Sequence, residues 1–303
     1  MPARFGLQWC VKVRNKLAHP STKFLISGAC KVINKFKTGA IIALALGAAA
    51  SSSAYAAVYT LDNAVASGLI TKWAEGPVGT LSINPAATID SLLAGNAAAP
   101  GGNIELSKYA GPVSTLTGTI NGHAITLSSL TKADWFTGNS FGTYTSLTEQ
   151  YISAAYQAAF GAAISAADLQ TAIQGFYNPS AVLGGLAPFQ FVSDPNISYV
   201  FQDGADLKVG LAGLYDATAF LRLLSPLAPA GSQASEVVKL TYGGVTTYLY
   251  TFDATPSGVT AGDRFGSYTG NYEVTTSAVP LPGTLALFGL GVAGLAAIRR
   301  RKA

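Results

Sequence analysis

The sequence predicts an α+β fold: a mainly antiparallel β domain with a central helical insertion, flanked by an apolar segment at each end of the chain. Three observations predict this class. Alternating apolar and polar stretches return on themselves across Asn-Gly or Gly-Gly pairs, a pattern typical of β-hairpins. Alanine-rich stretches with capping residues occupy the middle of the chain and indicate helices. The two terminal segments each combine an apolar run with a cluster of basic side chains.

Residues 1–56 have the layout of a secretory signal peptide with a long basic region. They hold eight basic side chains and no acidic one, and they continue into the apolar run Ile41–Ala50. The A-x-A pattern of Ala54 and Ala56 predicts cleavage before Ala57. The sequence leaves open whether the leader is extended or translation begins at an internal codon. Either form predicts passage through an export translocon.

Residues 57–277 form the expected secreted α+β body, which is long enough for one domain with a sizeable core. Seven basic and 15 acidic side chains give this body a net charge of −8. Nucleic acid is excluded as the expected partner, because binding phosphates needs a basic surface. Both cysteines, Cys10 and Cys30, lie in the leader, so the body has no disulfide and no thiolate metal site. No cofactor is predicted.

Strands are predicted where alternating patterns end at turn residues. The predicted strands are Ser114–Ile120, His123–Leu127, Ile197–Gln202, Leu207–Leu211, Val237–Tyr242, Val245–Phe252 and Tyr268–Thr276. Asn121-Gly122 and Gly243-Gly244 favour two-residue type I′ turns, because both positions of that turn need a positive φ. Asp203-Gly204 marks a third turn. These short connections predict antiparallel pairing.

Helices are predicted between the second and third of these strands. Ser146 and Glu149 have capping-box spacing and open an alanine-rich helix that is expected to reach Ala163. Ser165 and Asp168 repeat that spacing at the start of a second helix, which runs toward Gly175. Later in the chain, Asp216 is expected to cap a short third helix through Leu224, which Pro226 closes.

The C-terminal segment 278–303 combines a proline pair, an apolar run and a basic end. Leu285–Ile298 contains 14 residues with no polar side chain. As a helix this run is about 21 Å long, and about 30 Å when it is counted from Val279, which is a marginal membrane span. The following arginines are costly to move across a bilayer, so they predict a cytoplasmic C-terminus and a body on the opposite side. The chain is therefore expected to contact a membrane through this single transmembrane helix.

The order of these parts resembles a PEP-CTERM sorting domain. The resemblance rests on the apolar Leu/Gly-rich segment and on the flanking residues Val279, Pro280, Leu281, Pro282, Arg299, Arg300 and Arg301. It implies processing by an exosortase, a membrane cysteine protease, with a membrane-anchored intermediate on the way to the cell surface or extracellular matrix. Leu281 stands where the family usually has Glu, which leaves the efficiency of processing open. The alternative is a plain C-terminal membrane anchor that is never cut.

The body also resembles an uncharacterised PEP-CTERM exoprotein family. The segments that carry this resemblance are Leu116–Gly122, Leu127–Trp135, Ser193–Tyr199, Val209–Gly213, Ser235–Lys239 and Gly270–Val274. The resemblance implies a shared fold. It implies no catalytic residue, because the family has no established activity.

The residue types of the body argue against an enzyme. His123 is its only histidine, and its position after a hairpin turn is typical of a solvated strand residue rather than a general base. No G-x-S-x-G pattern presents a nucleophilic serine. The sequence therefore predicts no catalytic residue. A pair of carboxylates in a secreted carbohydrate-active hydrolase is the alternative, because such a pair forms in space and leaves no sequence pattern.

Two kinds of binding site are weighed against structural roles. Asp194, Asn196, Asp203 and Asp206 place oxygen ligands on short turns and are weak candidates for calcium, although Asx turns explain the same residues. Aromatic residues such as Trp73 could stack on sugar rings, but packing in the core is the more common role for such residues.

Together these observations predict an exported protein of the cell envelope or extracellular matrix. The expected role is structural or adhesive, in association with exopolysaccharide of the kind found in biofilms, and it rests on the resemblance and on the missing catalytic residues. The expected partners are the export translocon, an exosortase-type protease and the membrane.

Overall fold

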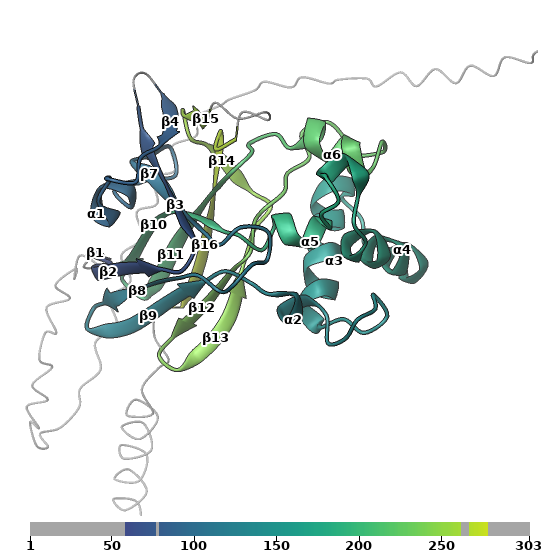
Figure 1. Ribbon diagram of the computed structural model, residues 1–303, viewed down its shortest axis with the longest axis horizontal. Coiled ribbons are helices and arrows are strands. Elements are labelled where there is room, and N and C mark those ends of the chain that lie inside the picture. Colours follow the sequence, from purple (N-terminus) through teal and green to yellow (C-terminus); the bar gives the residue numbers. More distant parts are fainter. Residues whose placement is uncertain (1–57, 77–78, 262–266, 278–303) are drawn as a thin grey trace, which may run out of the picture. The chain divides into compact units, whose positions relative to one another are not determined.

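The computed structural model describes residues 58–76, 79–261 and 267–277 (Figure 1). The predicted signal peptide, with its cleavage site at Ala54, Ala56 and Ala57, lies outside these residues, as does the predicted sorting segment 278–303. In the described part of the chain no helix is both long enough and apolar enough to cross a membrane. The described residues form a mainly β structure with few helices, which confirms the strand-rich part of the predicted fold class.

The larger sheet has nine strands, eight of them in the order β14-β16-β11-β10-β7-β3-β4-β15, with β1 pairing alongside β10. Its strands are β1 (Val58–Thr60), β3 (Ile70–Glu75), β4 (Thr80–Ile83), β7 (Gly102–Leu106), β10 (Asn196–Asp203), β11 (Asp206–Gly213), β14 (Ala254–Pro256), β15 (Thr260–Ala261) and β16 (Gly270–Ser277). All of its pairings are antiparallel except that of β15 with β4. The predicted hairpin across Asp203-Gly204 is present as β10 and β11.

The smaller sheet has five antiparallel strands in the order β13-β12-β9-β8-β2. These strands are β2 (Asp62–Ser67), β8 (Thr115–Ile120), β9 (His123–Ser128), β12 (Val238–Tyr242) and β13 (Val245–Leu249). Both predicted type I′ turns are confirmed by positive φ angles: 52° and 76° at Asn121 and Gly122, and 57° and 80° at Gly243 and Gly244.

The two sheets share one hydrophobic core. Alternating side chains from both sheets meet there, among them Ile104 and Leu106 of β7 and Leu116 and Leu127 of β8 and β9, all at most 1% exposed. The strand period of two directs these residues to one face, and their removal from water stabilises the pairing of the strands. β13 ends at Leu249, earlier than the predicted end at Phe252. The predicted end was wrong because the residues after Leu249 turn away to pack in a second core.

The second core joins the helices between β9 and β10 to the smaller sheet. These helices are α2 (Lys132–Trp135), α3 (Ser146–Phe160), α4 (Ala166–Tyr177), the 3-10 helix η1 (Ala181–Leu183) and α5 (Pro188–Phe191). Trp135 is fully buried and its ring meets those of Tyr151 and Phe176 edge to face, at 5.5 and 5.1 Å between centroids. Figure 1 shows α3 and α4 beside each other, in agreement with their packing.

The helix ends differ slightly from prediction. Thr145 occupies the N-cap position of α3 and Ser146 is the first helical residue, so the predicted capping box at Ser146 was wrong. The Thr145 hydroxyl makes no capping hydrogen bond and donates instead to the carbonyl of Asp134 at 2.8 Å. Gly161 adopts a left-handed φ of 67° and ends α3 before the predicted Ala163. Ser165 caps α4 as predicted, and its hydroxyl accepts from the Asp168 amide at 3.2 Å.

Three short elements complete the described fold: α1 (Ile89–Leu92), the hairpin of β5 (Gly95–Asn96) and β6 (Ala99–Pro100), and α6 (Thr218–Leu224). The N-cap residue of α6 is Ala217, so the predicted cap at Asp216 was wrong by one residue. Asp216 Oδ1 nevertheless accepts from the amide of Thr218, the first residue of α6, at 2.9 Å. The strands before residue 107 were not predicted from the sequence.

Candidate functional site

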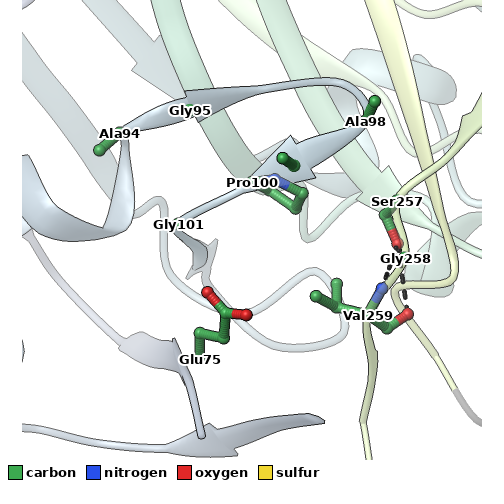
Figure 2. A pocket seen from close by; sticks show the side chains of 10 residues that line it. Glu75, Ala94, Gly95, Ala98, Pro100, Gly101, Ser257, Gly258 and Val259 are labelled. Carbon is green, nitrogen blue, oxygen red and sulfur yellow. Dashed lines mark hydrogen bonds between the residues drawn. The ribbon is translucent and has the colours of Figure 1, made fainter. Parts of the chain in front are cut away.

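An open pocket of about 400 Å³ lies between the β5–β6 hairpin and the segment Ser257–Val259. Figure 2 shows the side chain of Glu75 reaching into this space from the end of β3. Most of the lining is backbone, because the hairpin contributes glycine, alanine and proline. Gly95 has a φ of 107°, and a Cβ there would collide with the carbonyl of Ala99, so the hairpin requires glycine at this position.

The chemistry of this pocket is limited. Among the described residues that line it, Glu75 is the single titratable one. Acid–base catalysis on a glycosidic bond needs two carboxylates on opposite sides of the bond. The pocket can therefore accept hydrogen bonds from a ligand, but its lining does not supply the pair of groups that the hydrolase interpretation requires.

A second candidate lies at the start of β10, where three carboxylates gather in the protein interior. Asp194 and Glu105 are 6% and 8% exposed, and Glu105 pairs in register with Asn196 across β7 and β10. The carboxylate of Glu236 accepts two hydrogen bonds from Asn196, from its backbone N at 2.6 Å and from Nδ2 at 2.9 Å. Asp194 Oδ2 accepts a longer bond from the backbone N of Tyr109, at 3.4 Å. We call these four residues, Glu105, Asp194, Asn196 and Glu236, the buried acidic cluster.

Burial and mutual repulsion raise the pKa values of two carboxyls in the buried acidic cluster. Burial raises the pKa of Asp194 well above its usual value, and the negative charge of Glu105 adds to this effect. Burial and the neighbouring Asp194 likewise raise the pKa of Glu236, against the two hydrogen bonds from Asn196. Because the two carboxyls interact, they titrate as a pair and not as independent groups.

Several polar atoms in this region lack a hydrogen-bond partner within the described residues. They are Oδ1 of Asp194, Oδ1 of Asn196, and both amide atoms of Asn103, which lies two residues before Glu105 on β7. Buried polar atoms without partners are uncommon and are costly unless water or an ion satisfies them. Within residues 58–76, 79–261 and 267–277, however, no group of three His, Cys, Asp or Glu side chains has an arrangement that could hold a metal ion.

The structure divides the four weak calcium candidates into two pairs. Asp194 and Asn196 belong to the buried acidic cluster, whereas Asp203 and Asp206 face each other at the β10–β11 turn. Asn196 and Asp203 are seven positions apart on β10, which corresponds to about 23 Å of strand. One calcium ion therefore cannot use all four residues, and calcium binding at either pair stays a prediction.

Two members of the buried acidic cluster were missed in the sequence. Glu105 lies between Ile104 and Leu106, which are both fully buried, and Glu236 precedes the buried pair Val237 and Val238. A carboxylate directly beside apolar residues that enter a core is the sequence signal that could have identified them. Their contact with Asn196 depends on tertiary structure and has no sequence signal.

His123 lies on an exposed strand and the aromatic residues pack in the protein interior, as expected for residues with structural roles. His123 is exposed at the start of β9, with its ring edge-to-face to Tyr242 at 6.0 Å. Trp135 and Tyr272 are completely buried, and Trp73 packs edge-to-face on the buried Tyr268 at 5.2 Å. Core packing of these aromatic residues is therefore confirmed, and Trp135 and Tyr272 offer no ring face to a sugar.

Comparison with known families concerns the other end of the chain. Residues 278–302 match the family described as the PEP-CTERM protein-sorting motif. The chain carries this sorting motif. All seven predicted motif residues fall in the matched segment: Val279, Pro280, Leu281, Pro282, Arg299, Arg300 and Arg301. The PEP-CTERM motif supports an exported protein that passes through a membrane-anchored intermediate and is sorted by an exosortase.

The match covers the C-terminal segment and does not extend into the body. No curated protein and no solved structure matches the chain. The resemblance of the body to an uncharacterised exoprotein family therefore stays a prediction.

Proposed function

We propose that the body is a non-enzymatic structural or adhesive component of the cell envelope or extracellular matrix, associated with exopolysaccharide and delivered there by exosortase processing. The observation that carries this proposal is the PEP-CTERM motif at residues 278–302, because a sorting signal defines the route of the attached body. The final location, the processing of the Leu281 variant of the motif and the contact with polysaccharide are all parts of the proposal.

The described body supports a role without catalysis. The pocket beside Glu75 has one carboxylate, and Asp194 and Glu236 are not among the residues that line it. His123 is exposed on a hairpin, with an aromatic ring as its neighbour. These arrangements lack the nucleophile, base and orienting group of a covalent mechanism.

Sorting is tested by following the C-terminus. Cells with and without the exosortase are fractionated, and the exported protein is analysed by mass spectrometry. In normal cells we expect a mature chain that has lost the segment after Pro282 and has left the inner membrane. Without the exosortase we expect the intact tag in the membrane fraction. An intact chain through Ala303 in normal cells would contradict sorting and support the plain membrane anchor.

The Leu281→Glu variant provides a matched control for this experiment. It places the usual acidic residue between Pro280 and Pro282 without changing the apolar run or the arginines. We expect processing at least as complete as in the natural chain. If only this variant is processed, Leu281 blocks recognition and the natural protein stays anchored.

The role of the body is tested with the exported protein and exopolysaccharide from the same cells. We expect the protein to sediment with the polysaccharide and to release no soluble sugar from it. Steady release of sugar that depends on Glu75 or on Asp194 would instead identify a carbohydrate-active hydrolase.

A further inference from the structure

The edge strands of the two sheets differ in how well they are protected against pairing with another chain. In the larger sheet, the outer strands β1, β14 and β15 have three residues or fewer, and β14 ends in Pro256. In the smaller sheet, β2 has an irregular register between Asp62 and Val65, with a φ of 52° at Asn63. Short strands, proline, bulges and charges are the usual features that prevent edge-to-edge association.

β13, at the other edge of the smaller sheet, has none of these features. It pairs with β12 along its whole length, and in the described part of the chain its second side has no partner strand. Its sequence Val-Thr-Thr-Tyr-Leu consists almost entirely of β-branched and aromatic residues, with no charge, proline or glycine. Val245 is 60% exposed. This is a regular, uncharged edge that is suited to accept another strand.

The β12–β13 turn determines which backbone groups of β13 are free. Gly243 and Gly244 form a two-residue turn, so Tyr242 and Val245 make the first hydrogen-bonded pair. Residues in an antiparallel ladder alternate in direction, so the N–H and C=O groups of Thr246 and Tyr248 point away from β12. These groups form the row that an added strand would bind.

We propose that β13 pairs antiparallel with β13 of a second copy of this chain, with Thr247 at the two-fold axis. In this register, Thr246 of each copy exchanges backbone hydrogen bonds with Tyr248 of the other. Val245 faces Leu249 on one side of the joined sheet, and Thr246 faces Tyr248 on the other. Both are favourable cross-strand pairs, so the strand is complementary to itself.

Charge also favours a second copy at this edge. The body has a net charge of −8, which opposes close contact between copies at most surfaces. β13 has no charged residue, and Asp134, which accepts from the hydroxyl of Tyr248 in β13, forms an ion pair with Lys239 at 2.9 Å. The contact therefore brings no like charges directly opposite each other.

The contact is expected to be weak in dilute solution. A five-residue strand pair is smaller than the roughly 1,200–2,000 Å² that a stable protein interface buries. Copies held close together on a surface or in a matrix have a higher effective concentration, which favours weak contacts. A specific test must therefore detect the register of the pairing as well as the amount of dimer.

A single introduced thiol provides this test. In full-length chains carrying Cys10→Ala and Cys30→Ala, a Thr247→Cys substitution creates the sole thiol. Two-fold pairing places position 247 opposite itself in a non-hydrogen-bonded pair, within reach of a disulfide. After export and mild oxidation we expect a reducible dimer. The matched control, Ser67→Cys, places an exposed thiol on the other edge strand of the same sheet, and we expect about fivefold less dimer from it.

A second substitution tests whether pairing along the edge is the cause. Thr246→Pro removes an N–H that points away from β12, so the intrachain ladder keeps its bonds. In combination with Thr247→Cys, this substitution is expected to abolish the dimer. The variant is still expected to show a cooperative thermal unfolding transition, which indicates that the fold is retained. If the proline variant shows no cooperative unfolding transition, Thr246→Lys is used in its place, because a lysine on the exposed edge opposes pairing.

Three outcomes would overturn the proposal: equal dimer from both thiols, no dimer from Thr247→Cys, or a dimer that is insensitive to both substitutions at Thr246. The C-terminal motif is unchanged in every variant, so sorting is scored separately in the same cells. A sorted chain that fails to pair contradicts the edge contact alone, and a paired chain that keeps its tag contradicts the sorting proposal alone.

Discussion

Asp134 and Asp194 are both largely buried aspartates near the junction of the sheets and the helices, yet their surroundings have opposite effects. Asp134 Oδ1 accepts from Lys239 Nζ at 2.9 Å and from the hydroxyl of Tyr248 at 2.8 Å, while Oδ2 accepts from the amide of Thr131 at 2.8 Å. Burial alone would raise the pKa of Asp134, but these hydrogen bonds outweigh it and the pKa is lowered. Asp194 has a long bond from Tyr109 and two acidic neighbours, and its pKa is raised.

This difference shows that the hydrogen-bond and charge partners of a buried carboxylate, more than its degree of burial, decide whether it stabilises the fold. Asp134 completes the capping box of α2, whose N-cap residue is Thr131, and its carboxylate also binds Lys239 of β12 and Tyr248 of β13. Its charge therefore holds the helical region against the smaller sheet. Asp194 and Glu236 repel each other, so their ionised forms weaken the fold. Groups kept in a destabilising environment are more common at functional sites than elsewhere. Asp134 therefore has the surroundings of a structural residue, whereas the charges of the buried acidic cluster are held at a cost to stability.

The largest effect is expected from Asp134→Ala. The substitution removes the cap of α2 and leaves Tyr248 and the half-buried Lys239 without their carboxylate. We expect a loss of about 2–3 kcal/mol in the free energy of unfolding, allowing for the screening of the partly exposed lysine. Chemical denaturation measures this loss.

Asp168→Ala is the matched control, because Asp168 also occupies the first turn of a helix but is exposed on α4. Removing it should cost less than about 1 kcal/mol. Equal losses for the two variants would show that the contacts of Asp134 to β12 and β13 contribute nothing.

The next largest effect has the opposite sign and comes from Asp194→Asn. The raised pKa means that the folded state binds this proton more tightly than the unfolded state, whose carboxyl has a pKa near 3.8. Stability is therefore lost as pH rises from this value through the folded pKa, and the amide removes that loss. We expect a gain of about 1–2 kcal/mol at pH 7.5 and almost no gain at pH 2.5, where the carboxyl is almost fully protonated in both states. Destabilisation at pH 7.5 would show that the Asp194 charge has a partner.

A smaller effect is expected from Tyr248→Phe, which removes one hydroxyl from the Asp134 network and keeps the ring. Burial first, and then the hydrogen bond and negative charge of Asp134, raise the pKa of Tyr248 to about 12, because both effects favour the neutral phenol. We expect a loss of about 1 kcal/mol. In an Asp134→Ala background, the additional loss caused by Tyr248→Phe should nearly vanish, because the hydroxyl then has no carboxylate to bind. Fully additive losses would contradict the shared network.

The sequence predicts the features that depend on neighbouring residues, such as turns and helix starts, better than the contacts between residues far apart in the chain. The turns at Asn121-Gly122 and Gly243-Gly244 depend on residues at the turn itself, and both are present. The cap of α3 was misplaced because Thr145 and Ser146 are neighbouring residues of equal capping chemistry. The buried acidic cluster joins Asn196 to Glu236, 40 residues away, and to Glu105 through strand pairing. Such contacts depend on the complete fold, which no local pattern encodes.

The smallest effect is expected from calcium, which tests whether the buried acidic cluster is destabilising as a rule or only without a ligand. Calcium binds six to eight oxygen atoms, and each of the two candidate pairs supplies fewer on its own. The raised pKa values of Asp194 and Glu236 also mean that protons compete more strongly with a cation for these oxygens. We therefore expect the same melting temperature in calcium and in EDTA at pH 7.5. A higher melting temperature in calcium that disappears with Asp194→Asn but persists with Asp203→Asn would contradict this, because a ligand that binds the folded state alone raises its stability. The repulsion between Asp194 and Glu236 would then indicate a cation site. Asp134 and Asp194 would differ because Asp134 is neutralised by protein side chains, whereas Asp194 needs a bound cation.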